Sequence, residues 1–255
     1  GEMRVAFVGK GGAGKSSIAG VFARLLARDG TPVLALDSDP MPGLAYSLGV
    51  PNRDAGIPSE AVEEYEEEGR KKYRLRPGLD ATTAVERYAT VSPDGVLFVQ
   101  LGKARGVKDE NWRSHQAYQL IIDGLPDDEW SVVGDLPGGT RQPFFGWGRY
   151  ARIMLVVTEP TPASLLSARR LARLALHPAA PHVLAVANKT RSDSDVDLVA
   201  RRTGLRVVGN VPYDEAQGRA DRSGMALLDL DPSTAMVSAV ASLVSALGAE
   251  EIAVT

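Results

Sequence analysis

The stretch Arg4 to Ser17, RVAFVGKGGAGKSS, decides the fold of this chain. Its first half is apolar and branched, which predicts a buried β-strand over residues 3–8. Residues 9–16 then match the phosphate-loop pattern G-x-x-x-x-G-K-[ST] without a mismatch. Apolar residues at helical spacing follow the loop, at Ile18, Val21, Phe22, Leu25 and Leu26. A strand, a glycine-rich loop and a helix in this order predict a loop that binds a nucleotide through its phosphates.

Each residue type in the loop has a chemical reason. Three glycines allow backbone N–H groups to turn toward an anion, where side chains would obstruct them. Lys15 is expected to reach the β and γ phosphates, and the Ser16 hydroxyl to ligate magnesium. The alternative interpretation is an ordinary glycine-rich turn with a solvated lysine. We predict a nucleotide-binding set that comprises Gly11, Gly12, Ala13, Gly14, Lys15, Ser16 and Ser17.

The composition excludes several classes of protein. Of the 255 residues, 44% are hydrophobic and 24% are charged, as in ordinary soluble globular proteins. The net charge of −3 gives no overall basic field that would attract nucleic acid or anionic membranes. Cysteine is absent, which excludes disulfides, thiolate metal sites and cysteine nucleophiles. No apolar run approaches the ~20 residues of a membrane span. We therefore expect a cytoplasmic protein that binds neither membranes nor nucleic acid.

Short apolar runs along the rest of the chain predict further strands, and helical patterns separate them. The strands are expected at residues 33–36, 96–101, 131–135, 153–157, 182–187 and 205–208. Strands that alternate with helices predict an α/β fold with a doubly wound, mainly parallel β-sheet flanked by helices. No internal repeat or low-complexity linker interrupts this pattern. We therefore expect a single P-loop domain over residues 1–255.

Three segments between these strands carry predictions of their own. Residues 58–80 form a charged insertion, in which an acidic run precedes a basic run. Within it, residues 58–76 predict a solvated helix, and a partner-docking surface is the functional alternative. Residues 87–101 predict a β-hairpin around Pro93-Asp94-Gly95. Residues 102–111 predict a polar loop.

Carboxylates stand at the ends of two predicted strands. Asp37 and Asp39 follow residues 33–36, and Asp135 ends residues 131–135. Ligands of open α/β sheets bind outside the carboxyl ends of the strands, so we expect these side chains near the phosphate loop. Both Asp39 and Asp135 also precede residues typical of turns, which leaves a structural role open.

The phosphate loop with its early lysine, Lys10-Gly-Gly-Ala-Gly-Lys-Ser16, combines with Asp39 and with Asp135-Leu-Pro-Gly-Gly139. This combination resembles the deviant Walker A ATPases of the SIMIBI class, the MinD/ParA family that includes the nitrogenase iron protein. The resemblance covers nearly the whole chain and implies an ATPase that uses ATP and Mg²⁺. The later landmarks are most similar to the CooC-like ATPases of carbon monoxide dehydrogenase maturation. These landmarks are Val157-Thr-Glu-Pro160, Asn188-Lys189, Gly209 to Asp214 and Ala220 to Gly224.

The resemblance implies catalytic roles for several matching residues. Lys15 binds the phosphates in its own subunit, whereas Lys10 reaches across a dimer interface to the nucleotide of the partner subunit. Asp39 orients the attacking water molecule, and the amide of Gly139 contacts the γ-phosphate. Hydrolysis in such a homodimer awaits dimerisation, so that ATP works as a switch on a partner protein that the sequence does not identify.

The resemblance also implies a metal site and a base site. Ser16 holds Mg²⁺, Asp135 supports a water molecule on the metal, and Asp37 lies close to the metal shell. Asn188 and the segment Pro212, Tyr213 and Asp214 hold the adenine. Asn188 could instead be a structural strand end.

The residues after Asn188 predict a choice of base. GTPases of the same superclass carry Asn-Lys-x-Asp, whose carboxylate accepts two hydrogen bonds from guanine. Here the sequence is Asn188-Lys189-Thr190-Arg191. An arginine cannot accept these bonds, which predicts ATP as the nucleotide.

The chain departs from the CooC-like pattern at its metal motif. CooC-like proteins carry a Cys-x-Cys pair that holds metal between subunits, but the corresponding segment Gly102 to Asn111 contains no thiol. Three functions stay open: an ATPase that matures or remodels a partner enzyme without a metal cargo, a MinD/ParA-like positioning or regulatory ATPase, and a nucleotide-binding protein with degraded hydrolysis. Candidate partner surfaces are residues 58–80 and the aromatic and basic segment 141–149, with Phe144, Phe145 and Trp147. Arginines that could form a DNA-binding face, more typical of solvated helices, are Arg169, Arg170, Arg173, Arg201, Arg202 and Arg206.

Overall fold

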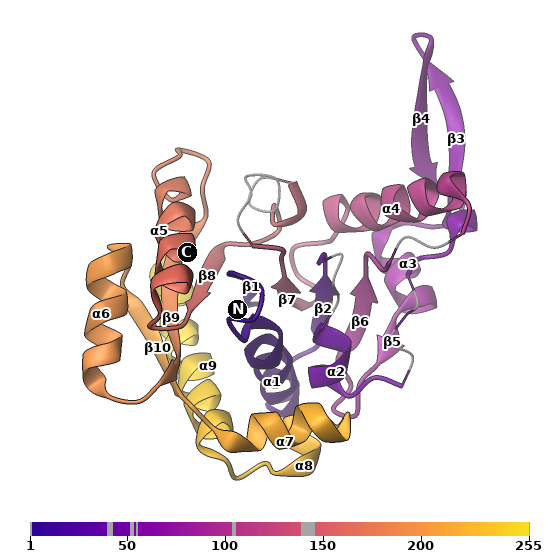
Figure 1. The fold of residues 1–255 in the computed structure, drawn as a ribbon. Coiled ribbons are helices and arrows are strands. Elements are labelled where there is room, and N and C mark those ends of the chain that lie inside the picture. The colour runs from indigo at the N-terminus through magenta and orange to yellow at the C-terminus, as the bar shows by residue number, and fades with distance from the viewer. Residues whose placement is uncertain are drawn as a thin grey trace.

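The computed structural model describes residues 2–39, 43–51, 54, 56–103, 106–138 and 146–254. Within these residues, eight strands form one sheet in the order β10-β9-β8-β1-β7-β2-β6-β5 (Figure 1). Neighbouring strands pair in parallel except β5, which is antiparallel to β6 at the edge. This confirms the predicted α/β fold with a mainly parallel sheet. The strands are β1 (Arg4–Val8), β2 (Val33–Asp37), β5 (Thr90–Val91), β6 (Leu97–Gln100), β7 (Ser131–Asp135), β8 (Ile153–Thr158), β9 (His182–Thr190) and β10 (Val207–Pro212).

Strand β1 shows why helices cover both faces of the sheet. Val5 and Phe7 belong to the core on one face, Ala6 and Val8 belong to the core on the other, and all four are fully buried. The first face packs against α1 (Lys15–Arg28), α2 (Leu44–Leu48), α7 (Glu215–Ser223), α8 (Leu227–Leu230) and α9 (Ala235–Val254). The second face packs against α3 (Ala81–Tyr88), α4 (Lys108–Asp123), α5 (Pro162–Leu174) and α6 (Asp193–Thr203).

The parallel register brings the acidic strand ends to one place. Asp37 of β2 lies opposite Asp135 of β7, and Asp135 lies opposite Phe7 of β1 on its other side. Strand β1 runs directly into the glycine-rich loop, and α1 begins at Lys15. The sheet therefore places the loop and the carboxylates at the same edge, as expected for parallel strands.

The helix predicted over residues 58–76 is wrong. This segment forms a 3₁₀ turn and a two-stranded antiparallel hairpin, which projects beyond α4 from the rest of the fold (Figure 1). Glu68 and Gly69, both at positive φ, lie at the tip between the two strands. The elements are η1 (Ser59–Ala61), β3 (Val62–Glu67) and β4 (Arg70–Leu75).

Charge pairing explains why the hairpin replaces the helix. The acidic and basic runs lie on facing strands, and Glu63 pairs with Arg74 at 2.6 Å while Glu67 pairs with Lys72. Opposite charges that face each other across two strands stabilise a hairpin in the way that i, i+4 pairs stabilise a helix. An acidic run followed by a basic run is therefore compatible with a hairpin as well as with a helix.

Two shorter predictions hold in part. The hairpin of residues 87–101 is confirmed for its turn, in which Ser92 donates its N–H to Val96 at 2.9 Å, and for the pairing of β5 with β6. Its first residues, however, belong to α3. Helix α4 begins at Lys108, inside the predicted polar loop. Among the described helices, none combines the length and the apolar composition that a membrane crossing requires.

Candidate functional site

The loop before α1 rests on the end of strand β9. Gly14 has a φ of +91°, and a Cβ at this position would lie only 2.2 Å from Asn188 Nδ2. Asn188 Nδ2 donates to the carbonyl oxygen of Ala13 at 2.7 Å, and Lys189 Nζ donates to that of Gly12 at 3.0 Å. Glycine is required at position 14 because of both the backbone angle and the space. The side chains of Asn188 and Lys189 thus hold the backbone of the loop through hydrogen bonds.

The N-terminus of α1 is open to an anion. Its N-cap residue is Gly14, which offers no side chain to the first backbone N–H groups, and the first turn carries no acidic residue. Lys10, Gly11 and Gly12 are exposed. Unsatisfied N–H groups and the positive end of the helix dipole favour a phosphate at such a site.

Lys15 lies at the centre of the candidate site. Its Nζ donates to Asp135 Oδ1 at 2.7 Å and to Asp39 Oδ2 at 3.0 Å. The Ser16 hydroxyl donates to the other carboxylate oxygen of Asp135. The side chains of Lys15 and Asp135 are buried, whereas that of Asp39 is 18% exposed. The structure therefore brings together the residues that the sequence predicted from the loop and from two strand ends.

Burial sets the electrostatics of this cluster. Burial and the charge of Asp135 raise the pKa of Asp37 to about 8. Burial also raises the pKa of Asp135, although Lys15 opposes this change. For Lys15, burial lowers the pKa, but the carboxylates of Asp135 and Asp39 together outweigh it and leave the pKa raised. Lys15 is therefore charged, and the cluster contains more acidic groups than cations.

Asp37 holds the backbone around the cluster. Its carboxylate accepts hydrogen bonds from the N–H groups of Asp39 at 2.9 Å, Gly43 at 3.3 Å and Leu44 at 3.2 Å. These bonds fix both ends of the segment that connects β2 with α2. The predicted place of Asp37 near a metal shell stays a prediction.

The oxygen donors fit Mg²⁺. A hydroxyl from Ser16 and a carboxylate from Asp135 are the hard ligands that Mg²⁺ prefers. Within the described residues, no group of three or more His, Asp or Glu side chains could hold a metal ion by itself. Ser16 and Asp135 would therefore hold a metal ion only together with other oxygen ligands, such as phosphate groups and water.

A cavity of about 370 Å³ opens over the loop. It contains residues that sequence reasoning did not assign to the site, namely Lys189, Gln217 and Asp221. Lys189 adopts a φ of +53° and also pairs with Glu159 at 3.1 Å. The dipeptide Asn188-Lys189 in the sequence could have pointed to Lys189. The sequence did not show, however, that the Lys189 side chain reaches the loop. The predicted residues that line the cavity are Gly11, Gly12, Gly14, Lys15, Ser16, Ser17 and Asp39.

A second cavity, of about 210 Å³, adjoins the first along α7. Among the residues that line it are all four that were predicted to hold adenine, Asn188, Pro212, Tyr213 and Asp214. The carboxylate of Asp214 accepts hydrogen bonds from two backbone N–H groups, one at the start of α7 (2.9 Å) and one in the first turn of α9 (3.0 Å). The guanidinium of Arg191 lies 4.4 Å from the centre of the Tyr213 ring. The cavity thus brings the four predicted residues together, and their role in holding a base stays a prediction.

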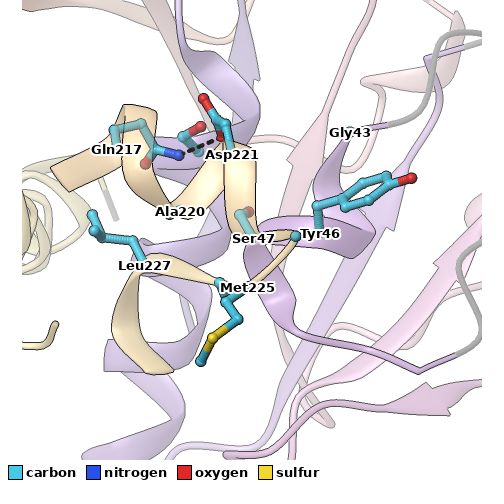
Figure 2. A pocket seen from close by; sticks show the side chains of 11 residues that line it. Gly43, Tyr46, Ser47, Gln217, Ala220, Asp221, Met225 and Leu227 are labelled. Carbon is cyan, nitrogen blue, oxygen red and sulfur yellow. Dashed lines mark hydrogen bonds between the residues drawn. The ribbon is translucent and has the colours of Figure 1, made fainter. Parts of the chain in front are cut away.

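A third, smaller cavity lies between α2 and the turn from α7 to α8 (Figure 2). Gln217 and Asp221 border all three cavities, and Gln217 Nε2 donates to Asp221 Oδ1 at 2.8 Å. Gln217 Oε1 is buried and accepts no hydrogen bond from a described residue. This face of α7 therefore borders all three cavities.

Some predicted residues are not placed relative to this space. Gly139 lies outside the described residues, as do positions 141–145 of the aromatic and basic segment. Trp147 is half-buried and packs against the core on the α4 side of the sheet. Lys10 is exposed at the start of the loop, and its role in a second subunit stays a prediction.

Comparison with known sequences identifies relatives over most of the chain. Residues 5–228 match the family described as CbiA, the CobQ/CobB/MinD/ParA nucleotide binding domain. The chain is 28% identical to the carbon monoxide dehydrogenase accessory protein CooC of Rhodospirillum rubrum, over 91% of each protein. It is also 28% identical to an uncharacterised ATP-binding protein of Methanocaldococcus jannaschii, over 84% of this chain and 86% of that protein.

Solved structures share the fold. The septum site-determining protein MinD of Pyrococcus horikoshii, complexed with Mg-ADP, superposes with a TM-score of 0.73 at 17% identity, over 99% of this chain and 98% of that one. A ParA family ATPase of Chlorobium tepidum superposes with a TM-score of 0.72 at 19% identity, over 96% of this chain and 98% of that one. At these identities the likeness concerns the fold.

Proposed function

Since the chain belongs to the CobQ/CobB/MinD/ParA nucleotide-binding domain family, we propose that it is a Mg²⁺-dependent ATPase that dimerises with ATP and acts on a partner protein. One observation carries the proposal, namely the contact of Lys15 with Asp135 at 2.7 Å and with Asp39 at 3.0 Å beneath an open phosphate loop. A lysine that can contact phosphates, an acidic residue near a metal site and a residue that can orient water are recurring parts of enzymes that transfer phosphoryl groups.

The proposed mechanism assigns one task to each of these side chains. The loop N–H groups and Lys15 bind the β and γ phosphates, for which Lys15 exchanges its carboxylate partners for phosphate oxygens. Ser16 and Asp135 would hold Mg²⁺, which supplies charge neutralisation when it is bound with ATP. Asp39, the carboxylate with an exposed fraction, accepts a hydrogen bond from water and holds it in line with the γ-phosphate. Positioning and electrostatic stabilisation supply most of the acceleration.

The choice of nucleotide is the first test of this proposal. We expect calorimetry with Mg²⁺ to show ATP binding with a Kd at least about 10-fold lower than that for GTP, because position 191 offers guanine no carboxylate. Instead, the Arg191 guanidinium packs on the Tyr213 ring at the base cavity. Tighter binding of GTP would contradict the prediction. No binding of either nucleotide would contradict the proposed function itself.

Lys10 provides a test of the dimer. Lys10→Ala is expected to lower ATP turnover at least about 100-fold and to change the Kd for ATP by less than about 3-fold, because the exposed lysine acts on the nucleotide of the second subunit. Phosphate release at rising protein concentration measures turnover, calorimetry measures the Kd for ATP, and light scattering in ATP reports the dimer. Lys71→Ala, which removes an exposed lysine of the hairpin, is the control. Wild-type turnover in Lys10→Ala would exclude the cross-subunit role.

The client is proposed by class. The relative in Rhodospirillum rubrum is by its name an accessory protein of carbon monoxide dehydrogenase. We infer that this chain matures or remodels a partner enzyme. Because the sequence has no cysteine, we infer further that it does so without a thiolate-bound metal cargo.

A further inference from the structure

Helices α5 and α6 lie side by side at one end of the fold, next to strand β9 (Figure 1). A groove of about 470 Å³ runs between them. Its apolar lining includes Leu165 and Leu166 from α5 and Leu198 from α6, and Leu166 is 53% exposed. The remaining lining residues are Pro160, Pro162, Arg169 and Arg202. The groove is therefore apolar at its base and has an arginine on each side.

Arginines are concentrated around this groove. Arg169, Arg170 and Arg173 of α5 and Arg201 and Arg202 of α6 are all exposed. Within the described part of the chain, none of the five forms an ion pair. The two helices thus carry a net positive charge and arginines without an ion-pair partner, although the chain as a whole has a net charge of −3.

Favourable interaction with the helix dipoles explains the positions of only some of these arginines. Arg173, Arg201 and Arg202 lie in the last turns of their helices, where a cation interacts favourably with the helix dipole. Arg169 and Arg170 lie too far from the end of α5 for this effect. Helix α6 also carries Asp193, Asp195 and Asp197, so the five arginines exceed the acidic side chains of the two helices by two. The dipole also does not account for Leu166, which is exposed in the same groove lining as Arg169 and Arg202.

We propose that the α5–α6 groove binds an acidic amphipathic helix of a partner protein. Apolar side chains at i, i+3 or i+4, and i+7 of that helix would cover Leu166 and Leu198, and its Asp or Glu side chains would pair with Arg169 and Arg202. Charge complementarity selects an acidic partner. The leucines select a protein helix over a nucleic acid, since phosphates gain nothing from an apolar floor.

The groove lies close to the cavity over the phosphate loop. Pro160 lines the groove, and Glu159, the residue before it, pairs with Lys189, which lines the cavity over the phosphate loop. Glu159 and Lys189 therefore connect a partner that contacts Pro160 in the groove with the cavity over the phosphate loop. The proposal itself stands on the groove and its charges and does not require ATP hydrolysis.

The test uses the full chain and a labelled synthetic probe. The probe is an 18-residue helical peptide with Leu at i, i+3, i+4 and i+7 positions and Glu on the flanks; a scrambled peptide of equal composition is its control. In fluorescence anisotropy we expect a Kd of tens of micromolar, which increases at least about 10-fold for Leu166→Ser and for Arg169→Ala/Arg202→Ala. Leu176→Ser, at a leucine that is 86% exposed and does not line the groove, is expected to bind as the wild type.

Each other outcome overturns the proposal. It fails if the patterned peptide does not bind, if the scrambled peptide binds equally well, or if Leu166→Ser leaves the Kd unchanged. A labelled DNA duplex is measured in parallel. Duplex binding that is weakened by Arg169→Ala/Arg202→Ala and not by Leu166→Ser would show a nucleic-acid surface instead. Circular dichroism establishes that each variant is folded, and the double arginine variant tests the groove independently of the leucine.

Discussion

Lys15→Ala is expected to lower the affinity for Mg-ATP at least about 100-fold, because a buried, charge-assisted contact to phosphate has no substitute at this place. Lys15 is the one described cation whose Nζ contacts both Asp39 and Asp135. Its removal takes away the cation that pairs with the buried Asp135 and the only lysine side chain of the loop that the structure buries, so the phosphates lose their charged donor. Isothermal calorimetry at saturating Mg²⁺ measures the change in Kd.

The control for this variant lies in the same loop. Lys10 is exposed, and Lys10→Ala is expected to keep the Kd for ATP near that of the wild type. Both variants change the net charge equally, so a difference between them reports position and not charge. An unchanged Kd in Lys15→Ala, in a protein that remains folded, would remove the basis of the proposed function.

Asp39→Asn is expected to lower turnover about 1,000-fold while the Kd for ATP changes less than about 5-fold, since the carboxylate acts on the attacking water and not on ground-state binding. The amide preserves the size of the side chain and loses the acceptor charge. The side chain of Asp39 is partly exposed and lines the cavity over the loop, which is where a water molecule could reach it. Single-turnover phosphate release with a parallel binding measurement separates the two effects.

Asp128→Asn provides the comparison for Asp39→Asn. Asp128 is exposed in the connection between α4 and β7, and its substitution is expected to leave turnover unchanged. If Asp39→Asn retains wild-type turnover, Asp39 serves as a turn residue, the structural alternative that the sequence left open. If ATP binding is lost together with turnover, Asp39 contributes to the binding of ATP and not only to its hydrolysis.

Two surfaces compete for the role of partner contact. The sequence favoured the charged segment 58–80, but its charges largely pair with one another across β3 and β4, for example Glu63 with Arg74. The arginines of α5 and α6 have no such partners among the described residues. An exposed charge that is already paired offers a partner less than one that is free. The α5–α6 groove is therefore the better candidate for the surface that contacts a partner protein.

The sequence by itself determined the phosphate loop, the alternation of strands and helices, and the acidic strand ends. These features depend on local rules. Glycine permits the backbone of the loop at Gly14, apolar runs of strand length become buried strands, and parallel strands all end at one edge. Because Asp37 and Asp135 end such strands, their proximity to Lys15 could be predicted without coordinates.

Only the tertiary structure decided what depends on contacts between distant residues. Whether residues 58–76 become a helix or a hairpin depended on which opposite charges meet, and both patterns fit the same runs. The position of Lys189 over Gly12 depends on a single positive φ at the end of β9. The α5–α6 groove exists because two helices, separated by strand β9 in sequence, pack on the same face of the sheet. Local preferences fixed the phosphate loop and the buried strands, whereas contacts between residues decided the hairpin of β3 and β4 and which side chains remain exposed for a partner.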